Sequence, residues 1–283
     1  MPDPADATEV VAPTLDATEL ALLTDAMRTA MTTATGVELD RALAELGWAD
    51  MLAETPAIAI PTAFRLLGET GSHASILIDV LRAADDTLPP EVPLPFAGGR
   101  RVIWDRAARP GSTIDGELPL RSLPNEATGI EESGSLEPSA LAAGRRALGW
   151  WLLGSGHAML SLARTHVLER IQFGRPLASF QAVRHRLAET LVALDGAEAA
   201  LAHADDQFGA LLAKAAAGRA ATTAARHCQQ VLGGIGFTAE HELHRHVRRV
   251  LVLDGLLGNT RELVREAGTE VRNRGEAPRL ANL

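Results

Sequence analysis

Two arginines and a glutamine stand around one sharp turn in the segment 169–181 (ERIQFGRPLASFQ). Arg170 and Arg175 bracket the turn that Gly174 makes, and Gln181 opens the helix predicted after it. Guanidinium groups beside the start of a helix suit an anionic ligand, because the helix dipole and free backbone N–H groups add to their charge. A plain helical hairpin with solvated arginines has the same pattern, so these residues alone leave both interpretations open.

A glycine-rich turn over 230–238 (QVLGGIGFT) is the second candidate for chemistry. Its glycines leave the backbone open to close approach by a phosphate-bearing cofactor. The string 234–239 also fits a loose dinucleotide fingerprint, G-x-G-x-x-A. That fingerprint needs a preceding strand, whereas 224–230 has the pattern of a helix. An ordinary turn between two helices is the alternative.

Other reactive side chains form weaker patterns. The histidines His241, His244 and His246 do not share one helical face, and no carboxylate–histidine spacing of a zinc site surrounds them. We therefore predict structural or surface histidines and no metal site. Cys228 lies on an alanine-rich helix face and is predicted to be a small buried filler. Ser155 lacks the strand–turn–helix setting of a nucleophile elbow.

Composition limits the classes of function. The chain of 283 residues has 27 basic and 36 acidic residues, a net charge of −9, which argues against nucleic-acid or anionic-membrane binding. A single cysteine excludes an intrachain disulfide. The N-terminus has no signal pattern, and the richest apolar run, 148–163, is too short to span a bilayer. We expect a cytoplasmic protein. Lys214 is the only lysine, and there is no tyrosine to act as an acid.

The elements that position these residues are mostly helical. Asp16 and Glu19 make a capping pair for a first helix, a second covers 39–46 and stops at Gly47, and a third runs from near residue 72 through residue 80. Between 84 and 138 the chain carries eight prolines, which exclude long helices. Short strands are predicted there at 101–105 (RVIWD) and 117–121 (ELPLR).

The C-terminal part carries four apolar stripes at helical spacing. They cover 141–167, 183–201 and 208–231, the last ending at a glycine pair, and a fourth helix starts near Thr238. The second stripe comprises Val183, Leu187, Leu191, Leu194 and Leu201. Four such helices with short joins predict a bundle. The expected regions are N-terminal helices over 1–83, a reduced β or irregular middle segment over 84–138, and a four-helix bundle within 139–283.

Together, the arginine and glycine segments resemble the C-terminal bundle of the acyl-CoA dehydrogenase family. The family pattern of an arginine before Phe-Gly, then Pro-Leu and a Phe-Gln pair, appears as 170–177 (RIQFGRPL) with 180–181. Its Gln-x-x-Gly-Gly-x-Gly-aromatic turn appears over 230–237. The charged residues that follow at family spacing are Glu240, Arg245 and Arg248. The resemblance covers about 139–265 and, more faintly, 16–83. It implies a mainly α, acyl-CoA dehydrogenase-like fold.

The resemblance also implies an activity, the α,β-dehydrogenation of an acyl-CoA thioester. In that family a glutamate takes the α-proton and the β-hydride passes to the flavin N5 of FAD. The matched residues contact the adenosine and pyrophosphate of a neighbouring subunit's FAD: Arg170, Phe173, Gln181, Gln230, Gly233 and Gly234. Acyl-CoA is thereby the implied substrate, and an electron-acceptor flavoprotein is among the implied partners.

The chain departs from the family at the catalytic base. The usual glutamate before a glycine is Leu257 here, followed by Gly258. Some members carry the base on the helix before the arginine motif, and that position falls near Gly144. Neither residue can accept a proton. Asp254 and Glu262 flank the Leu257 position and are the acids that a relocated base would use.

The middle segment also departs from the family. It spans 55 residues, shorter than the β domain of family members, and lacks a Thr-Glu-Pro-type flavin-contact segment. Actinobacterial family members that act on steroid side-chain CoA thioesters are heterotetramers in which one kind of subunit supplies the base. We therefore expect a base-lacking subunit that needs a companion acyl-CoA dehydrogenase chain. A homo-oligomeric enzyme with a relocated base, and a flavin-free scaffold, are the alternatives.

Overall fold

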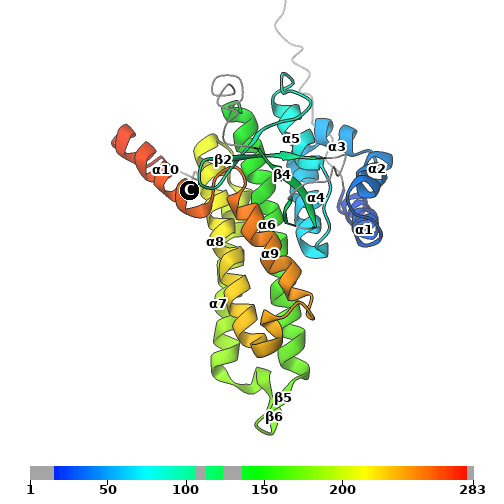
Figure 1. Cartoon of the computed structure of the whole chain (residues 1–283), viewed down its shortest axis with the longest axis vertical. Coiled ribbons are helices and arrows are strands. Elements are labelled where there is room, and N and C mark those ends of the chain that lie inside the picture. The colour runs from blue at the N-terminus through cyan, green and yellow to red at the C-terminus, as the bar shows by residue number, and fades with distance from the viewer. Residues whose placement is uncertain (1–15, 106–112, 116, 124–135, 279–283) are drawn as a thin grey trace, which may run out of the picture.

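The computed structural model describes residues 16–105, 113–115, 117–123 and 136–278, and it is mainly helical (Figure 1). The helices are α1 (Ala17–Thr33), α2 (Val37–Glu45), α3 (Trp48–Glu54), α4 (Pro56–Thr70), α5 (Ile76–Ala84), α6 (Pro138–Glu169), α7 (Gln181–Ala202), α8 (Gln207–Leu232), α9 (Leu243–Gly255) and α10 (Thr260–Arg274). Two short 3₁₀ helices are η2 (Leu177–Ser179) and η3 (Gly233–Phe237). The strands are β1 (Leu94–Phe96), β2 (Arg100–Trp104), β3 (Thr113–Asp115), β4 (Leu118–Ser122), β5 (Ile171–Gln172) and β6 (Arg175–Pro176).

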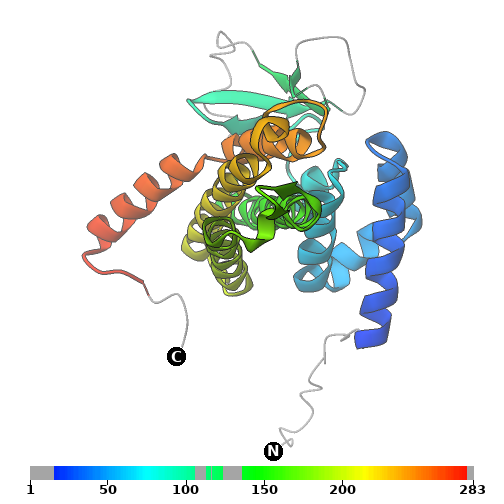
Figure 2. The ribbon, with the colours of Figure 1, turned by 90° about the horizontal axis from the view of Figure 1, so that it is seen from below.

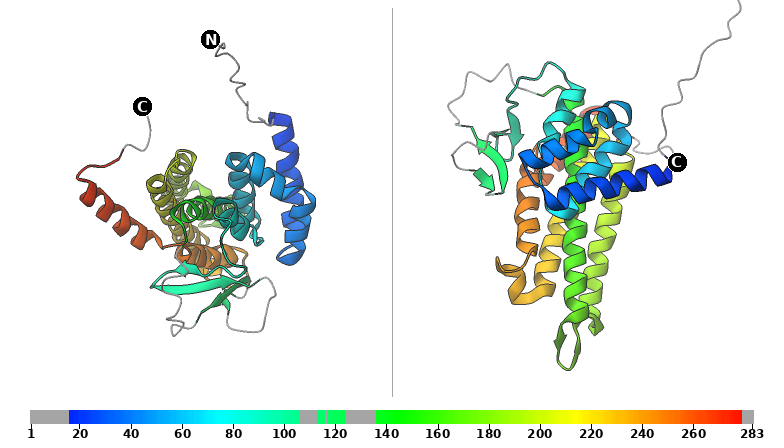
Figure 3. Two further views of the ribbon diagram at one scale, coloured as in Figure 1. Left: turned by 90° about the horizontal axis from the view of Figure 1, so that it is seen from above. Right: turned by 90° about the vertical axis from the view of Figure 1, so that its right-hand side faces the viewer.

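Helices α6, α7, α8 and α9 form an elongated bundle. The β5–β6 hairpin lies at one end of it, and the small sheet and the N-terminal helices lie toward the other (Figure 1). Seen along the bundle, the sheet covers α9 on one side, while the N-terminal helices pack beside α6 (Figure 2, Figure 3). The predicted mainly α fold, with N-terminal helices, a small β insert and a helical C-terminal part, is confirmed.

The N-terminal helices show one success and one failure of the sequence prediction. The Asp16 carboxylate accepts hydrogen bonds from the N–H groups of Thr18 and Glu19, so the predicted capping pair is confirmed. Helices α3 and α4 were missed. Prolines mask α4: Pro56 occupies its first turn, where a missing N–H costs nothing, and Pro61 lies inside and removes one hydrogen bond. The helix expected from near residue 72 is α5, which starts at Ile76.

The middle segment forms an antiparallel sheet with strand order β1-β2-β4-β3. The two predicted strands are confirmed as β2 and β4, one residue away from the predicted bounds. Strands β1 and β3 were not predicted, because each has only three residues and shows no alternating pattern of its own. Two of the eight prolines, Pro110 and Pro124, lie outside the described residues.

The bundle helices match the predicted stripes with two corrections. Leu191 is 44% exposed, because α7 packs on α6 and α8 along one side only and leaves its opposite side to solvent. The fourth helix, α9, begins at Leu243 and not near Thr238, since residues 238–242 form turns, in which the His241 ring accepts from the Leu243 N–H. Helix α10 was not predicted, and it rests on α8 through a separate apolar cluster. That cluster comprises Phe208, Leu211, Ala215, Leu263 and Ala267.

One apolar core joins the three regions. The fully buried Trp151 of α6 contacts Phe64 of α4 in an edge-to-face arrangement, with ring centroids 6.0 Å apart. On another side it meets Trp104 of β2 at 6.2 Å. The N-terminal helices, the insert and the bundle therefore share this side chain. No helix within the described part of the chain combines the length and the apolar character needed to cross a bilayer.

Candidate functional site

The predicted arginine turn is a short hairpin at the end of the bundle. Helix α6 ends at Glu169, and the Arg170 N–H donates to the carbonyl of His166 at 2.8 Å. The chain then reverses through Phe173 (φ 54°) and Gly174 (φ 78°), a pair of left-handed residues that suits a two-residue hairpin. The hairpin therefore projects its side chains beyond the helices.

The hairpin side chains form an ordered, exposed group. Phe173 is 87% exposed and stands edge-on to Phe180, with ring centroids 5.9 Å apart. The Arg175 guanidinium lies 4.3 Å from the centre of the Phe180 ring. The Arg170 side chain has no hydrogen-bond or ion-pair partner among the described residues. Gln181 opens α7, exposed, with its amide nitrogen 3.3 Å from His185 Nε2. An aromatic face and an unpaired guanidinium are thus available to a ligand.

The glycine turn leaves an open stretch of backbone. Helix α8 ends at Leu232, and Gly233 adopts a left-handed conformation (φ 68°) that favours glycine. A methyl group added at Gly233 or Gly234 would meet no atom within 4 Å. Gln230, in the last turn of α8, is exposed. Close approach by a phosphate to this backbone is therefore sterically free.

The two turns lie in the same half of the bundle, the hairpin at its extreme end (Figure 1). Among the residues that the structure describes, no side-chain hydrogen bond joins the hairpin group to the glycine turn. Burial, and then the positive charges of His241 and Arg170, lower the pKa of His166 on α6. Both groups include side chains or backbone exposed to solvent.

The two positions expected for a catalytic base meet inside the protein. A Cβ added to Gly144 of α6 would lie 2.6 Å from Cδ1 of Leu257 and 2.7 Å from Cδ2 of Leu81. Leu257 is 1% exposed and adopts a left-handed backbone conformation (φ 56°), which is strained for a residue with a side chain. The segment 254–258, made of the end of α9 and the turn after it and called the loop 254–258 below, therefore brings residue 257 against Gly144. Leucine side chains fill the space between them.

Two buried basic side chains hold this loop. Lys214 Nζ donates to the carbonyl oxygens of Asp254 (3.0 Å) and Gly258 (2.5 Å). Arg145 donates through Nε to the Leu257 carbonyl (3.1 Å) and through both terminal nitrogens to Glu266 of α10 (3.0 Å each). Burial lowers the pKa of Lys214 to about 7, although the neighbouring Asp254 charge acts against this. Sequence reasoning gave neither residue this role.

In the sequence, Arg145 and Lys214 could be recognised as charged residues at positions where the helical pattern calls for an apolar one. Arg145 falls four residues after Leu141 and three before Leu148, inside the first bundle stripe, and Lys214 falls three residues after Leu211. A charged residue at such a position is rarely buried without partners. This pattern predicts an internal clamp, although it does not identify which carbonyls the clamp holds.

Asp254 and Glu262 are engaged in local structure. Asp254 Oδ1 accepts from the N–H (3.1 Å) and the hydroxyl (2.5 Å) of Thr260. Glu262 completes a capping box at the start of α10, accepting from the Asn259 N–H, and also accepts from the Gly98 N–H, at 3.0 Å each. The Gly98 bond, then the Asn259 bond, lowers the pKa of Glu262, which weakens it as a base.

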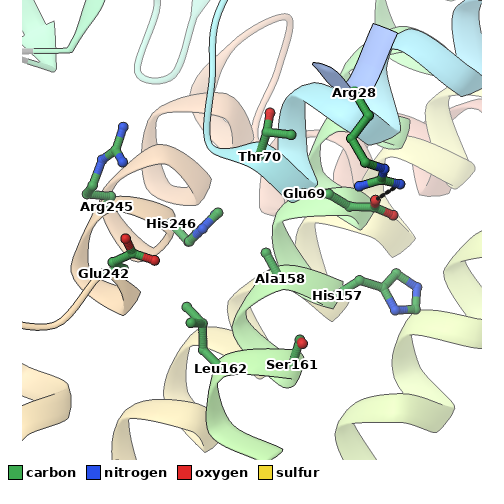
Figure 4. Close-up of a pocket in the computed structure, with 10 residues that line it drawn as sticks. All are labelled: Arg28, Glu69, Thr70, His157, Ala158, Ser161, Leu162, Glu242, Arg245 and His246. Carbon is green, nitrogen blue, oxygen red and sulfur yellow. Dashed lines mark hydrogen bonds and ion pairs between the residues drawn. The ribbon is translucent and has the colours of Figure 1, made fainter. Parts of the chain in front are cut away.

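A cavity of about 450 Å³ lies apart from all the predicted site residues, between α1, α4, α6 and the start of α9 (Figure 4). It is lined by Arg28, Glu69, Thr70, His157, Ala158, Ser161, Leu162, Glu242, Arg245 and His246. Arg28 and Glu69 pair at 2.9 Å, and the His246 ring turns inward from α9. Burial lowers the pKa of His246 to about 4, so its imidazole is neutral at pH 7.

The other groups singled out in the sequence have structural environments. Cys228 is fully buried, and burial raises the pKa of its thiol to about 12, as expected for an inert filler. Ser155 is fully buried on α6. Within the part of the chain that the structure describes, no three His, Cys, Asp or Glu residues gather closely enough to hold a metal ion.

Comparison with known proteins assigns the family. The profile described as "Acyl-CoA dehydrogenase, C-terminal domain" matches residues 137–267. Acyl-CoA dehydrogenase IpdE2 of Mycobacterium tuberculosis is 34% identical over 177 residues, 61% of this chain. The chain spans 55% of that relative's length.

Two solved structures share the fold. One is the ChsE4-ChsE5 complex from Mycobacterium tuberculosis, with TM-score 0.66, 17% identity, and coverage of 94% of this chain and 99% of that one. The other is a glutaryl-CoA dehydrogenase from Mycobacterium smegmatis in complex with FADH2, with TM-score 0.63 and 18% identity. The match covers 93% of this chain and 96% of that one. The motifs, the matched profile and the shared fold agree, and the part of the chain over residues 137–267 belongs to the acyl-CoA dehydrogenase family.

Proposed function

We propose that this chain is a subunit of a heteromeric, FAD-dependent acyl-CoA dehydrogenase and that its companion chain supplies the proton-abstracting carboxylate. The observation that carries the proposal is the contact between Leu257 and Gly144. These are the two positions at which the family resemblance places a base, and both are apolar and buried. The relatives support a paired assembly, since one matching structure is named as a complex of two proteins.

The bundle end fits the adenosine diphosphate half of FAD. The group would meet an unpaired guanidinium at Arg170, an exposed aromatic ring at Phe173, and open backbone at Gly233 and Gly234. Arginine suits a pyrophosphate because its charge and fixed donors match phosphate oxygens. Gln181 and Gln230 would add amide hydrogen bonds. When bound, FAD supplies the hydride acceptor for the reaction, whereas this chain's residues bind and orient its phosphate end.

Leu257 and the two acids that flank it do not fit a proton-transfer role. Leu257 has no titratable group, and Asp254 and Glu262 already accept hydrogen bonds from backbone N–H groups and a hydroxyl. This arrangement weighs against a homo-oligomeric enzyme with a relocated base. A flavin-free scaffold is the remaining alternative, and it leaves the unpaired Arg170 and the open glycine backbone without a use.

Co-expression with a companion tests the proposal. The chain is produced together with a full-length acyl-CoA dehydrogenase of the same organism, and the mixture is purified through a tag on this chain alone. We expect a yellow complex that reduces a dye acceptor when an acyl-CoA is added. Changing the companion's base from Glu to Gln should abolish turnover without loss of colour, since the flavin site would remain intact.

Substitutions in this chain separate the alternatives. Asp254→Asn and Glu262→Gln should leave turnover of the complex within about twofold, because neither carboxylate transfers a proton in the proposal. A loss of turnover in either variant, in a complex that keeps its flavin, would favour the relocated base. A colourless chain that never associates with the companion would exclude the heteromeric enzyme.

A further inference from the structure

Strand β1 of the insert lies directly on the loop that carries residue 257. The Leu257 N–H donates to the Pro95 carbonyl at 2.8 Å, and the Ala97 N–H donates to the Gly255 carbonyl at 2.8 Å. Between these bonds, Phe96 and Leu256 form an antiparallel bridge. The insert thus adds a short strand to the edge of the loop, although about 160 residues separate the two segments in sequence.

Side chains seal both faces of this contact. The Phe96 ring packs on Gly255 so closely that a Cβ added there would lie 2.8 Å from it. Beyond the strand, the Gly98 N–H donates to the Glu262 carboxylate at 3.0 Å. On the opposite face, Leu257 packs on Gly144, which Leu81 also contacts. Residue 257 is therefore enclosed by β1, α5 and α6.

Two buried basic side chains also bind the loop, so it cannot easily turn away from β1. Lys214 binds the carbonyls that precede and follow the strained segment, and Arg145 binds the carbonyl of Leu257 itself. All hydrogen-bonding backbone groups of Leu257 are therefore used within the chain. A buried group that gives up such a bond without replacement loses stability.

From this arrangement we infer that β1 is a latch that closes this chain's own copy of the dehydrogenation site. The inference rests on the proposed function. An acyl thioester reaching residue 257 would have to displace the Pro95 carbonyl from the Leu257 N–H and the Leu257 side chain from Gly144. The chain therefore takes no acyl-CoA at its own loop and acts through the hairpin and the glycine turn.

The first test moves a base into the closed site. In the complex whose companion carries Glu→Gln at its base, this chain carries Leu257→Glu, and Leu257→Gln is the matched control without a base. We expect both complexes to stay yellow and to show less than about a hundredth of wild-type turnover with butyryl-CoA. Recovery of turnover by Leu257→Glu but not by Leu257→Gln would overturn the latch, because substrate would then reach residue 257.

A second measurement avoids a substitution that disturbs folding. Hydrogen exchange of the Ala97 and Leu257 amides is followed in the wild-type complex with and without saturating butyryl-CoA. We expect both amides to exchange at least about a hundredfold more slowly than in an unfolded peptide, with no change on adding butyryl-CoA. Fast exchange, or a change at Leu257 on adding butyryl-CoA, would contradict the latch.

The same two amides distinguish the two proposals. If the chain forms no yellow complex with its companion, the proposed function fails, and the exchange of Ala97 and Leu257 in the free chain still tests the latch. If the complex is yellow and active but the two amides exchange freely, the latch fails and the proposed function stands.

Discussion

Arg170 is the residue at which a role in ligand binding can best be distinguished from a role in stabilising the fold. Its guanidinium has no partner in the described part of the chain, so removing it takes nothing from the folded state that the structure shows. Under the proposed function it meets a diphosphate, and a charge-assisted hydrogen bond of that kind contributes about 1.5–3 kcal/mol. A residue with a purely structural task would show the opposite pattern, a loss of stability without a loss of ligand.

We predict that Arg170→Ala weakens FAD retention by the heteromeric complex by roughly ten- to a hundredfold. The melting temperature of the isolated chain should stay nearly unchanged. Flavin fluorescence during dilution of the complex measures the first effect, and circular dichroism measures the second. Arg164→Ala, which removes another exposed arginine of α6, is the control. Equal flavin loss in both variants would mean that general charge, and not this site, holds the cofactor.

Lys214 gives a prediction about pH. Its folded pKa of about 7 lies below the ordinary 10.5. Between these values the unfolded chain holds a proton that the folded chain lacks, so the free energy of unfolding rises with pH from about 7 upward. The slope due to this group is on the order of 1 kcal/mol per pH unit. Lys214→Met should flatten the dependence between pH 7 and pH 8, below the ordinary pKa of 9.0 at which the Cys228 thiol of the unfolded chain ionises.

Chemical denaturation at a series of pH values tests this slope. Because Lys214 is the only lysine, selective ¹⁵N labelling of lysine gives one side-chain nitrogen signal, whose titration reports the pKa directly. A midpoint near 10.5 would contradict the buried environment described here. A parallel pH dependence in wild type and Lys214→Met would assign the slope to other groups.

The sequence could predict some site residues and not others, for physical reasons. Arg170, Gln230 and Gly233 belong to local patterns, where neighbours in sequence make the turn. Lys214 can be recognised in the sequence only as a charge at a buried helix position. Such a charge implies a hydrogen-bond partner, but the sequence does not identify it. Pro95 carries no signal at all. It acts through its backbone carbonyl, and any residue in β1 offers the same group to the loop.

At the scale of elements, the β5–β6 hairpin is the part that presents the aromatic and arginine side chains. Its turn needs left-handed backbone at Gly174 (φ 78°), where a Cβ costs roughly 1 kcal/mol. We predict that Gly174→Ala lowers flavin affinity of the complex several-fold, because Phe173 and Arg175 leave their positions beside Phe180. The same substitution should change the stability of the isolated chain by no more than about 1 kcal/mol.

A second glycine provides the control for this substitution. Gly268 lies inside α10 with no atom within 4 Å of an added Cβ, so Gly268→Ala should stabilise the chain by up to about 1 kcal/mol through helix propensity. It should leave flavin affinity unaltered. If Gly174→Ala also leaves flavin affinity unaltered, the hairpin geometry does not matter for binding. Flavin titration and thermal unfolding of the two variants, side by side, decide this.

The elements that sequence reasoning missed share one property, that a local rule is overridden by packing. Helix α4 contains two prolines, yet its buried Phe64 and Leu67 hold it against α6. Leu191 fits the spacing of a buried stripe, yet no described residue of this chain covers α7 on that side. The apolar periodicity of α6 and α8 was sufficient to predict these helices and their buried residues, because other elements cover both helices over most of their length. Periodicity identifies a helix more reliably than it identifies what covers each face.

At the scale of the whole molecule, three regions with different compositions share one core. The expected boundaries near residues 84 and 139 stay a prediction, since a change of composition does not show that the parts fold separately. Trp151 argues that they do not. Phe64 from the N-terminal helices and Trp104 from the insert both contact its ring, so its removal opens a cavity where all three regions meet.

We therefore predict that Trp151→Ala lowers the free energy of unfolding by about 3–5 kcal/mol and that unfolding remains one cooperative transition. The measurement is urea unfolding, monitored by far-ultraviolet circular dichroism and by hydrogen exchange in α4, β2 and α8. Leu22→Ala on α1, where the side chain is 67% exposed, should cost less than about 0.5 kcal/mol and serves as the control. Loss of protection in β2 alone, with α4 and α8 unaffected, would show that the insert folds independently. In that case the latch on residue 257 would be tied to a region able to open without unfolding the bundle.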